Sequence, residues 1–546
     1  MATIVNANDI NKSKRNENDS IDINVRIGVF FDGTNNNRAQ VTMGRLAREK
    51  NNEATEQEIK ENNEILSNMK LDKLTKKERI AIELSSDKAQ TKREILNKRN
   101  KWRLGMPRGF MQGVGYTNIA ILERFYRPNN EYDYSYKIYV TGSGTFANMS
   151  KGISVAGLAA GQGYSGVVQK IWDALDALAT RICFYNFDGS ILGVNYIFDV
   201  FGFSRGAAEA RLFVDLCCER GNRPSVLRRG IKKYNKKFSN NNSSSEDKII
   251  FPKQKDIKFN VGVYDTVASV GVIRNPQWAP SALSIPVTGI ERVSVTASTF
   301  HDENVRDLGL NTLAHDASVQ KVIHICALDE YRENFALCAL PDGGQVTQFL
   351  IPGIHTDIGG SELPDCHRGE ISLPVMKEKH RLKISKVSPR QDGIEMTLEN
   401  MKRLGWLKDD TNTPNDMKRD IFDYNNKADN IDVQRYSMGT YSNLPLAIMA
   451  QKHDDVFTFQ TIKTKHTIPD GLPQSFEDME NSWSGCNSNY GKCYFPIEEK
   501  DYRSLRMRYL HFSSSAGSVN GPHYNDNYCY ERILYTESGI DTLREC

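Results

Sequence analysis

One stretch constrains this chain more than any other: a strand-like apolar run that ends in a glycine-flanked serine and continues directly into a helical pattern. The run covers residues 196–201, and the turn after it reads Gly202-Phe-Ser-Arg-Gly206. This is the G-x-S-x-G pattern of a nucleophile elbow, in which the glycines let a strained serine project its hydroxyl above the sheet edge. The alanine-rich residues 207–210 favour a helix packed closely on the strand. The pentapeptide also occurs in ordinary strand–helix turns, but its flanking elements favour a nucleophilic Ser204.

The charge balance argues against a broad nucleic-acid-binding surface. The chain of 546 residues has 71 Lys plus Arg and 68 Asp plus Glu, which gives a formal net charge of +3 with both signs mixed along the sequence. This length predicts one large domain with insertions, or two domains. The ten cysteines are scattered without C-x-x-C pairs. We therefore expect reduced thiols and neither a metal nor another cofactor.

Between residues 25 and 360, apolar strand-like segments alternate with helical patterns. The first strand, Val25–Phe31, is the near-continuous apolar run typical of a buried parallel strand. The alternation predicts right-handed crossovers and an α/β fold, specifically an α/β-hydrolase-like, mostly parallel sheet flanked by helices. Residues 1–24 are polar and contain no apolar segment, which predicts a disordered leader and no signal peptide.

Two regions depart from this alternation. Residues 38–104 are rich in Glu, Lys, Asn and Arg, and predict an insertion of charged helices. A solvated helical excursion is the favoured interpretation of that insertion over a dedicated binding surface. Residues 361–546 form a mixed, partly helical C-terminal region with a predicted helix over 443–451.

A nucleophilic serine needs a base and an acid, which in hydrolases of this architecture follow it in the order Ser, Asp or Glu, His. Asp265 ends the apolar strand 257–264, and His355 lies in a glycine-rich loop after another strand. The imidazole takes the serine proton, and a buried carboxylate fixes the imidazole tautomer. A strand-end cap and a loop histidine would explain each residue separately. Their joint placement in the required order favours a triad of Ser204, Asp265 and His355.

The oxyanion of such a reaction is held by backbone N–H groups. One predicted donor is the amide of Arg205, directly after the serine. The other should come from a loop after an early strand, for which Gly33 and Thr34 are the candidates.

Several further residues are candidate supports or rivals of the triad. Asp32 and His511 are candidates for a supporting role, and we expect Asp357 to brace the histidine loop by local hydrogen bonds. His324 lies within an apolar strand, where a hydrogen-bonded core histidine is the simpler interpretation. The other rival bases in non-random contexts are His315 and His523.

Four ordered motifs together resemble the α/β-hydrolase phospholipase effectors of bacterial type VI secretion systems. They are Phe30-Phe-Asp-Gly-Thr-Asn-Asn36, Gly202-Phe-Ser-Arg-Gly206, Tyr264-Asp-Thr-Val-Ala-Ser-Val270 and Pro352-Gly-Ile-His-Thr-Asp-Ile-Gly-Gly360. The resemblance implies the triad named above and hydrolysis of glycerophospholipid acyl esters. It also implies synthesis in the cytoplasm, delivery on the secretion spike to a rival's periplasm, and an immunity protein in the producer. Inserted segments, among them residues 361–546, would dock on the phospholipid membrane.

Three alternatives remain open at this stage. A housekeeping serine esterase or lipase would use the same triad. An aspartyl phosphatase is suggested by Phe31-Asp-Gly-Thr34, although that loop calls for a second aspartate where Phe30 stands. A non-catalytic, spike-associated binding protein could keep the fold, and a chemically reactive Ser204 would exclude it.

Overall fold

The computed structural model describes most of the chain, with gaps. The described residues are 3–7, 21–34, 36–50, 54, 56–68, 75–100, 115–128, 131–144, 167–184, 191–218, 257–268, 312–362, 375–383, 402–406, 421–422, 430–483, 487–489, 492–494, 499–512, 530–536 and 539–545.

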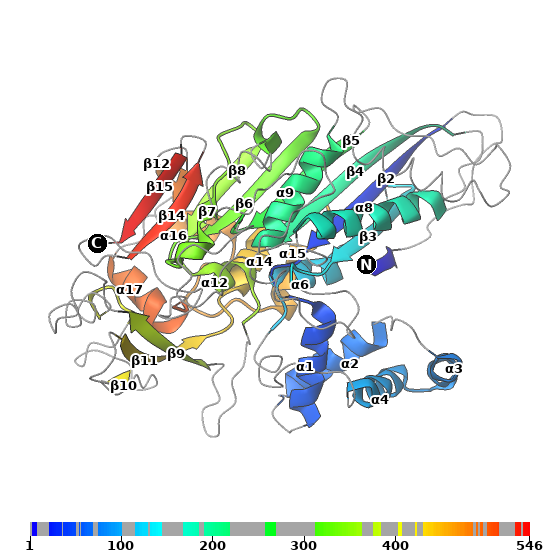
Figure 1. Cartoon of the computed structure of the whole chain (residues 1–546), viewed down its shortest axis with the longest axis horizontal. Helices are drawn as coiled ribbons and strands as arrows, with labels where there is room; N and C mark the ends of the chain where they lie inside the picture. Colours follow the sequence, from blue (N-terminus) through cyan, green and yellow to red (C-terminus); the bar gives the residue numbers. More distant parts are fainter. Residues whose placement is uncertain are drawn as a thin grey trace, which may run out of the picture.

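A nine-stranded sheet forms the centre of the described structure (Figure 1). Seven neighbouring strands are parallel, and a short antiparallel strand closes each edge. This arrangement confirms the predicted α/β class with a mostly parallel sheet. The spatial order is β1 (Thr3–Ala7), β3 (Tyr134–Val140), β2 (Ile21–Phe31), β4 (Ile191–Phe203), β5 (Ile257–Tyr264), β6 (Val319–Ala327), β8 (Val346–Ile351), β13 (Lys492–Tyr494) and β12 (Asn487–Asn489).

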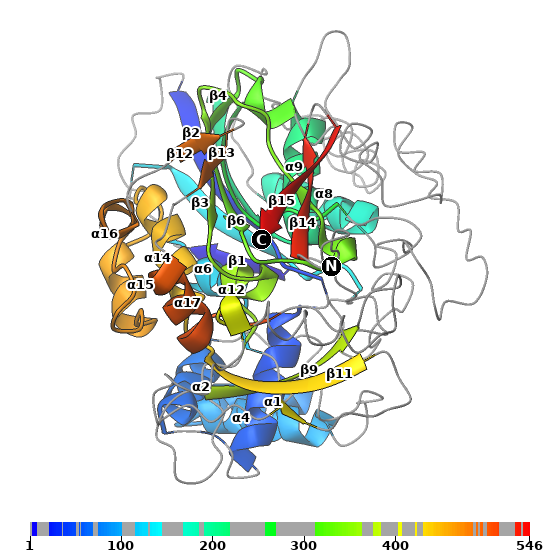
Figure 2. The same cartoon turned by 90° about the vertical axis from the view of Figure 1, so that its left-hand side faces the viewer.

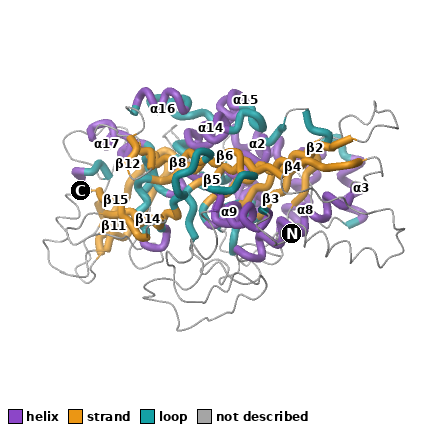
Figure 3. Tube along the Cα trace, turned by 90° about the horizontal axis from the view of Figure 1, so that it is seen from above, coloured by secondary structure: helices purple, strands orange, loops and turns teal. Residues whose placement is uncertain are grey.

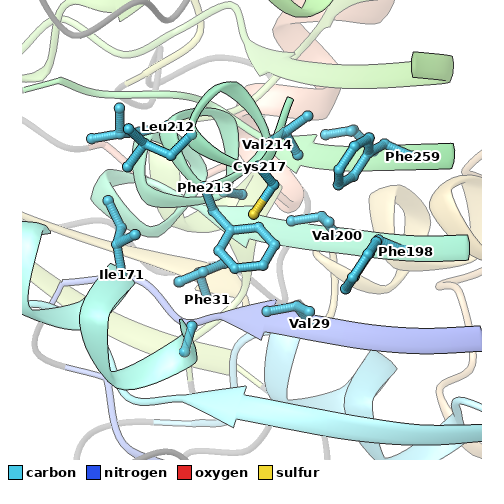
Figure 4. Packing of buried hydrophobic residues seen from close by; sticks show 14 of the residues in the cluster. Val29, Phe31, Ile171, Phe198, Val200, Leu212, Phe213, Val214, Cys217 and Phe259 are labelled. Carbon is cyan, nitrogen blue, oxygen red and sulfur yellow. The ribbon is translucent and has the colours of Figure 1, made fainter. Parts of the chain in front are cut away.

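One face of the sheet is covered by α8 (Val167–Phe184) and α9 (Arg205–Cys217) (Figure 3). Alternate residues of each strand point into this layer, as the two-residue period of a strand requires. In β2 and β4 these include Phe31 and Phe198, which pack against Phe213 of α9 (Figure 4). Burying each such side chain contributes about 1.5–3 kcal/mol. Because the elbow serine lies between β4 and α9, this core fixes the position of both arms of the turn.

The opposite face is covered by α6 (Asn118–Phe125), α14 (Asn443–Lys452), α15 (Phe459–Lys465) and α16 (Phe476–Ser482) (Figures 2 and 3). The strands contribute Phe30 and Phe201, whose rings stack at 5.1 Å, and Phe457 packs on Phe201 at 5.3 Å. A single apolar cluster joins these strands to the C-terminal helices.

The C-terminal region is therefore not separate from the catalytic core, in contrast to the predicted division at residue 360. Its helices α14–α16 cover one face of the sheet together with α6, and its strands β12 and β13 extend the sheet beyond β8. The sequence predicts a division there because the strand–helix alternation fades. That alternation fades because the later helices pack on strands that lie far earlier in the sequence.

The predicted leader at residues 1–24 also differs from the structure. The short strand β1 pairs antiparallel with β3, and β2 begins at Ile21, four residues before its apolar run. An edge strand needs only backbone hydrogen bonds on one side, so a five-residue segment can pair without an apolar pattern. Residues 8–20 lie outside the described part of the chain.

The charged segment 38–104 contains four helices, α1 (Arg38–Lys50), α2 (Glu56–Asn68), α3 (Lys76–Leu84) and α4 (Lys88–Asn100). A small apolar cluster joins α1, α2 and α4. A three-stranded sheet is formed by β9 (Val375–Lys383), β10 (Ile421–Phe422) and β11 (Asn430–Met438). The four helices and this small sheet both lie below the main sheet in Figure 1. The four helices follow the carboxyl end of β2 in the sequence, and the small sheet follows that of β8. Open α/β sheets bind ligands at the carboxyl ends of their strands.

A second three-stranded sheet joins β7 (Leu337–Cys338), β14 (Tyr530–Thr536) and β15 (Gly539–Glu545). Its central strand β14 is parallel to β7 and antiparallel to β15. Within the described residues, no helix has both the length and the apolar character needed to cross a membrane.

Candidate active site

Ser204 adopts the strained backbone of a nucleophile elbow. Its φ and ψ are 60° and −127°, a region that residues with a side chain rarely occupy. The turn needs its two glycines, since a Cβ on Gly202 would lie 2.3 Å from the Gly206 carbonyl oxygen, and a Cβ on Gly206 would lie 2.4 Å from that of Phe31. The amides of Ala207 and Ala208 donate to the Ser204 carbonyl and begin α9. The serine is therefore held by backbone geometry on both sides.

The predicted acid and base are in direct contact. His355 Nδ1 lies 2.6 Å from Asp265 Oδ2, and the two side chains are 5% and 0% exposed. Asp265 directly follows β5 in a left-handed conformation with φ of 41°, and its amide donates to Ile325 of the neighbouring strand at 2.8 Å. His355 begins the short helix α12 (His355–Gly359) after β8. This contact leaves the other ring nitrogen, Nε2, available to act as a base.

The three candidate residues lie along one edge of the sheet. Phe203 pairs with Tyr264 in neighbouring strands, so Ser204 and Asp265 leave the sheet at the same level. The His355 ring packs against the ring of Phe203 at a centroid distance of 4.6 Å, which places the base beside the elbow. Gly359 permits this approach, because a Cβ there would lie 2.0 Å from the Phe203 ring. The fold thus brings residues that are 61 and 90 positions apart in sequence to one edge of the sheet.

Burial and neighbouring charges give Asp265 and His355 different charge states. Burial opposes ionisation of Asp265, but the charge of Arg532 and the contact with His355 outweigh it and hold the pKa of Asp265 well below its ordinary value. Burial lowers the pKa of His355 below its ordinary value of about 6.5, although Asp265 opposes this shift. At neutral pH Asp265 is therefore an anion and His355 a neutral imidazole, which are the ground states that general-base catalysis needs.

The oxyanion candidates divide into two groups. The amide of Arg205 is the first of α9, where helix N–H groups point out of the helix. The Gly33 amide donates to Asp32 Oδ1 at 2.8 Å, so the prediction of Gly33 as an oxyanion donor is wrong. The sequence could not show that a neighbouring carboxylate takes up this N–H. Thr34 remains a candidate, and its hydroxyl accepts from Arg205 Nε at 2.7 Å. This bond ties the loop after β2 to the elbow.

Asp32 braces that loop from beneath. It is 1% exposed and accepts from the hydroxyl of Thr117 at 2.6 Å, from Gly33 N and from the hydroxyl of Tyr139. Burial raises the pKa of Asp32 to about 6, against the lowering effect of these hydrogen bonds. A buried carboxylate with both oxygens occupied is poorly placed to attack a phosphoryl group, which argues against the aspartyl phosphatase alternative.

Asp357 and His511 form a second acid–histidine contact that supports the histidine loop. Asp357 Oδ2 accepts from the amides of Ile354 and His511, each at 3.0 Å, and its Oδ1 is hydrogen-bonded to His511 Nδ1. Asp357 therefore braces its own loop, as its spacing predicts, and ties that loop to the C-terminal region. Asp265, and not Asp357, makes the contact with the His355 ring.

The two rival histidines that the structure describes, His324 and His315, have other environments. His324 is fully buried in β6, with Nδ1 at 2.8 Å from Gln348 and Nε2 near Thr266, so it is a hydrogen-bonded core residue. His315 is exposed after a short 3-10 turn, and His523 lies outside the described residues. No group of three or more His, Cys, Asp or Glu side chains in the described part of the chain is arranged to hold a metal ion.

Three supporting groups are not apparent from the sequence. Arg532 Nη2 donates to Asp265 Oδ1 at 2.8 Å. Glu330 accepts from the His355 amide at 3.2 Å and pairs with Arg332 at 2.8 Å, and Asp329 accepts from the Gly353 amide at 2.6 Å. None of the three has a signal of its own in the sequence, since even Arg532 stands beside Glu531 in a strand that is only partly apolar.

A model of the catalytic domain of the family "T6SS, Phospholipase effector Tle1-like" matches residues 108–379, about half of the chain. The matched region contains Ser204, Asp265 and His355. A comparison with curated proteins finds no match. One similar solved structure is that of the Tle1 effector bound to the VgrG spike of the type 6 secretion system, at 18% identity, 97% and 98% coverage of this chain and that one, and a TM-score of 0.46. Another is an uncharacterized protein from Pseudomonas aeruginosa, at 15% identity, 63% and 42% coverage, and a TM-score of 0.26. On the family match, the chain belongs to the Tle1-like phospholipase effectors of the type VI secretion system.

Proposed function

We propose that this protein is a serine carboxylester hydrolase of the phospholipase A type, which removes acyl chains from glycerophospholipids. The observation that carries the proposal is the elbow serine beside a buried His355–Asp265 pair, with the contact at 2.6 Å. A phospholipase of another type would not need this combination. Nucleophilic attack on an acyl carbonyl does need it, because the serine hydroxyl is a weak nucleophile until a base takes its proton.

The mechanism follows from the charges of the site. Ser204 Oγ attacks the acyl carbonyl while His355 accepts its proton, and Asp265 stabilises the imidazolium that forms. Backbone N–H groups, with that of Arg205 first among them, hold the oxyanion, and each such donor contributes on the order of 10²–10³ in rate. His355 then donates its proton to the leaving lysophospholipid oxygen. Water, activated by the same histidine, hydrolyses the acyl-enzyme and releases the fatty acid.

The biological role that we infer is that of an antibacterial toxin. The family to which the chain belongs consists of type VI secretion effectors, which supports carriage on a secretion spike. The solved Tle1 effector is bound to the VgrG spike, and we extend a spike partner of this kind to the present protein. Cytoplasmic synthesis, delivery to the periplasm of a target cell, action at its phospholipid membrane and a cognate immunity protein complete the proposal.

The enzymatic proposal is tested on vesicles of phosphatidylethanolamine and phosphatidylglycerol, with the products resolved by mass spectrometry. We expect the wild type to release equal amounts of fatty acid and lysophospholipid, and Ser204→Ala to release neither. Phosphatidic acid or diacylglycerol as the product would contradict an acyl-ester hydrolase, because those products require cleavage at phosphorus.

The toxin role is tested by expression in a bacterial host with and without an export signal. Growth arrest only with export, and only with an intact Ser204, is the expected result. Turnover of phospholipid in vitro without toxicity in the periplasm would favour a housekeeping esterase or lipase.

A further inference from the structure

The carboxylate of Asp265 is held from two sides. Its Oδ2 faces His355, while its Oδ1 accepts from Arg532 Nη2 at 2.8 Å and from the amide of Ala327 at 2.9 Å. The side chains of Asp265 and Arg532 are both 0% exposed. The acid therefore sits between a neutral base and a permanent cation, with no exposed surface through which solvent could screen either contact.

Arg532 reaches this position from the far end of the chain. It lies on β14, whose Leu534 pairs with Leu337 of β7. The amide of Cys338, also in β7, donates to the carbonyl oxygen of Thr266, the residue directly after Asp265, at 2.8 Å. Leu534 and Leu337 share a buried apolar cluster with Cys326 and Leu350 of the main sheet. The C-terminal hairpin is thus attached to the loop that carries the acid.

We propose that Arg532 is a positioning residue of the hydrolase site, which keeps the Asp265 carboxylate ionised and aligned with His355. The inference rests on the proposed function, since it assigns Arg532 a role in the same triad. Arg532 lies outside the region that the family's catalytic-domain model matches, so the site depends on a strand beyond that region.

The charge of Arg532 has a second consequence for His355. With Asp265 partly neutralised, protonation of His355 is less favoured than it would be beside an isolated carboxylate. The other charged groups that face His355 are Glu330, through the backbone amide, and Arg332, which pairs with Glu330. These two form their own ion pair, so Arg532 is the cation that balances Asp265.

Removal of the Arg532 charge should shift the acid limb of the pH–rate profile to higher pH. An unbalanced Asp265 anion favours the imidazolium form of His355, and a buried Asp265 without a partner also takes up a proton at higher pH. Both changes remove the active ionisation state as the pH falls. A role of Arg532 in folding alone would lower the amount of active enzyme and leave the pH profile unchanged.

The test measures the rate constant for labelling of Ser204 by a fluorophosphonate between pH 4 and 9, with the thermal midpoint of each variant. The variants are Arg532→Met, Arg532→Lys and Arg26→Met. Arg26→Met is the matched control, because Arg26 of β2 forms a buried ion pair with Asp199 of β4 at 2.7 Å. Asp199 lies five residues before Ser204 on the same strand. We expect Arg532→Met to label at least about 10²-fold more slowly at pH 7, with the acid limb shifted upward by about one pH unit or more.

Arg532→Lys should return the acid limb of the labelling rate most of the way to its wild-type pH, because it keeps the charge. Arg26→Met should lower the thermal midpoint, while the folded protein labels with the wild-type pH profile. A folded Arg532→Met with the wild-type rate and limb would overturn the inference. Should Arg532→Met not fold, the double variant Asp265→Asn with Arg532→Met removes the whole charge pair. We then expect it to label within about three-fold of Asp265→Asn alone, and a further large loss would overturn the inference. A folded wild type that is not labelled at Ser204 would overturn the proposed function, and the positioning role with it.

Discussion

The nucleophile turn and the histidine turn lie at the same edge of the sheet but are stabilised in different ways. The turn at Ser204 is fixed by backbone sterics. A Cβ on Gly202 would lie 2.3 Å from the carbonyl oxygen of Gly206, and a Cβ on Gly206 would lie 2.4 Å from that of Phe31 at the end of β2. The turn at His355 is fixed by charged side chains, namely Asp329, Glu330 and Asp357, which accept from three consecutive amides, those of Gly353, His355 and Ile354.

This difference shows which part of the sequence determines each turn. The glycines and the serine are five consecutive residues, so the elbow is a local property. The carboxylates of the histidine turn are in turn held by residues much later in the chain, since Arg506 and Tyr502 donate to Asp329, and His511 donates to Asp357. The histidine turn therefore depends on the C-terminal region being folded in place, and the elbow does not.

The largest effect on kcat is expected when His355 loses the carboxylate of Asp265. Asp265→Asn should lower kcat by about 10⁴-fold, because an amide favours the wrong imidazole tautomer. It should also reduce stability by about 3–5 kcal/mol, because the buried Arg532 loses its counter-charge. Kinetics with a soluble ester and thermal unfolding check both effects, and normal turnover in a folded Asp265→Asn protein would contradict the assignment of the acid.

The elbow should break under a substitution that adds a single methyl group. Gly206→Ala places a Cβ 2.4 Å from the carbonyl oxygens of Phe31 and Asp32, so α9 must move away from the end of β2. We expect a stability loss of about 1–3 kcal/mol and a fall in kcat of about 10²-fold.

Gly344→Ala is the matched control, since a Cβ there meets no atom within 4 Å, and it should leave both quantities unchanged. Equal behaviour of the two variants would show that the elbow is not held by close backbone packing.

A smaller effect is expected at the brace of the histidine turn. Asp357→Asn keeps the volume but loses the charge that accepts from Ile354 and His511, so stability should fall by about 1–3 kcal/mol. Turnover by the folded fraction should change by less than about ten-fold. The comparison of melting temperature with kcat is decisive: a stable but inactive Asp357→Asn protein would make Asp357, and not Asp265, the catalytic acid.

The smallest effect is a shift in the pH profile. The pKa of His355 is lowered by burial, so the acid limb of kcat/KM should reach half its maximum below pH 6.5. Activity is lost as the pH falls through this pKa, because the protonated imidazole cannot accept the proton of Ser204. A half-maximum above pH 6.5 in the wild type would show that the charge of Asp265 outweighs burial at this site.

Sequence patterns predicted the features that short segments encode. The strands, the elbow at Ser204 and the carboxylates and histidine at later strand ends follow from apolar runs that end in polar or glycine-rich turns. The bracing role of Asp357 follows from its place two residues after His355. The packing of residues 443–483 on the sheet and the pairing of Arg532 with Asp265 did not follow, because contacts between distant segments leave no local pattern. The bond from the Gly33 amide to the Asp32 side chain leaves no pattern in the sequence either, which is why the prediction of Gly33 as an oxyanion donor is wrong.

The central claim is that Ser204 is an activated nucleophile, and the most direct measurement is mass mapping after treatment with a fluorophosphonate. We expect one phosphonyl adduct per chain, on the peptide that contains Gly202–Gly206, and its loss in Ser204→Ala. His355→Gln should slow the labelling by at least about 10³-fold, because the serine then lacks its base. A folded wild type that carries no adduct at Ser204, or one that labels at the same rate without His355, would contradict the account.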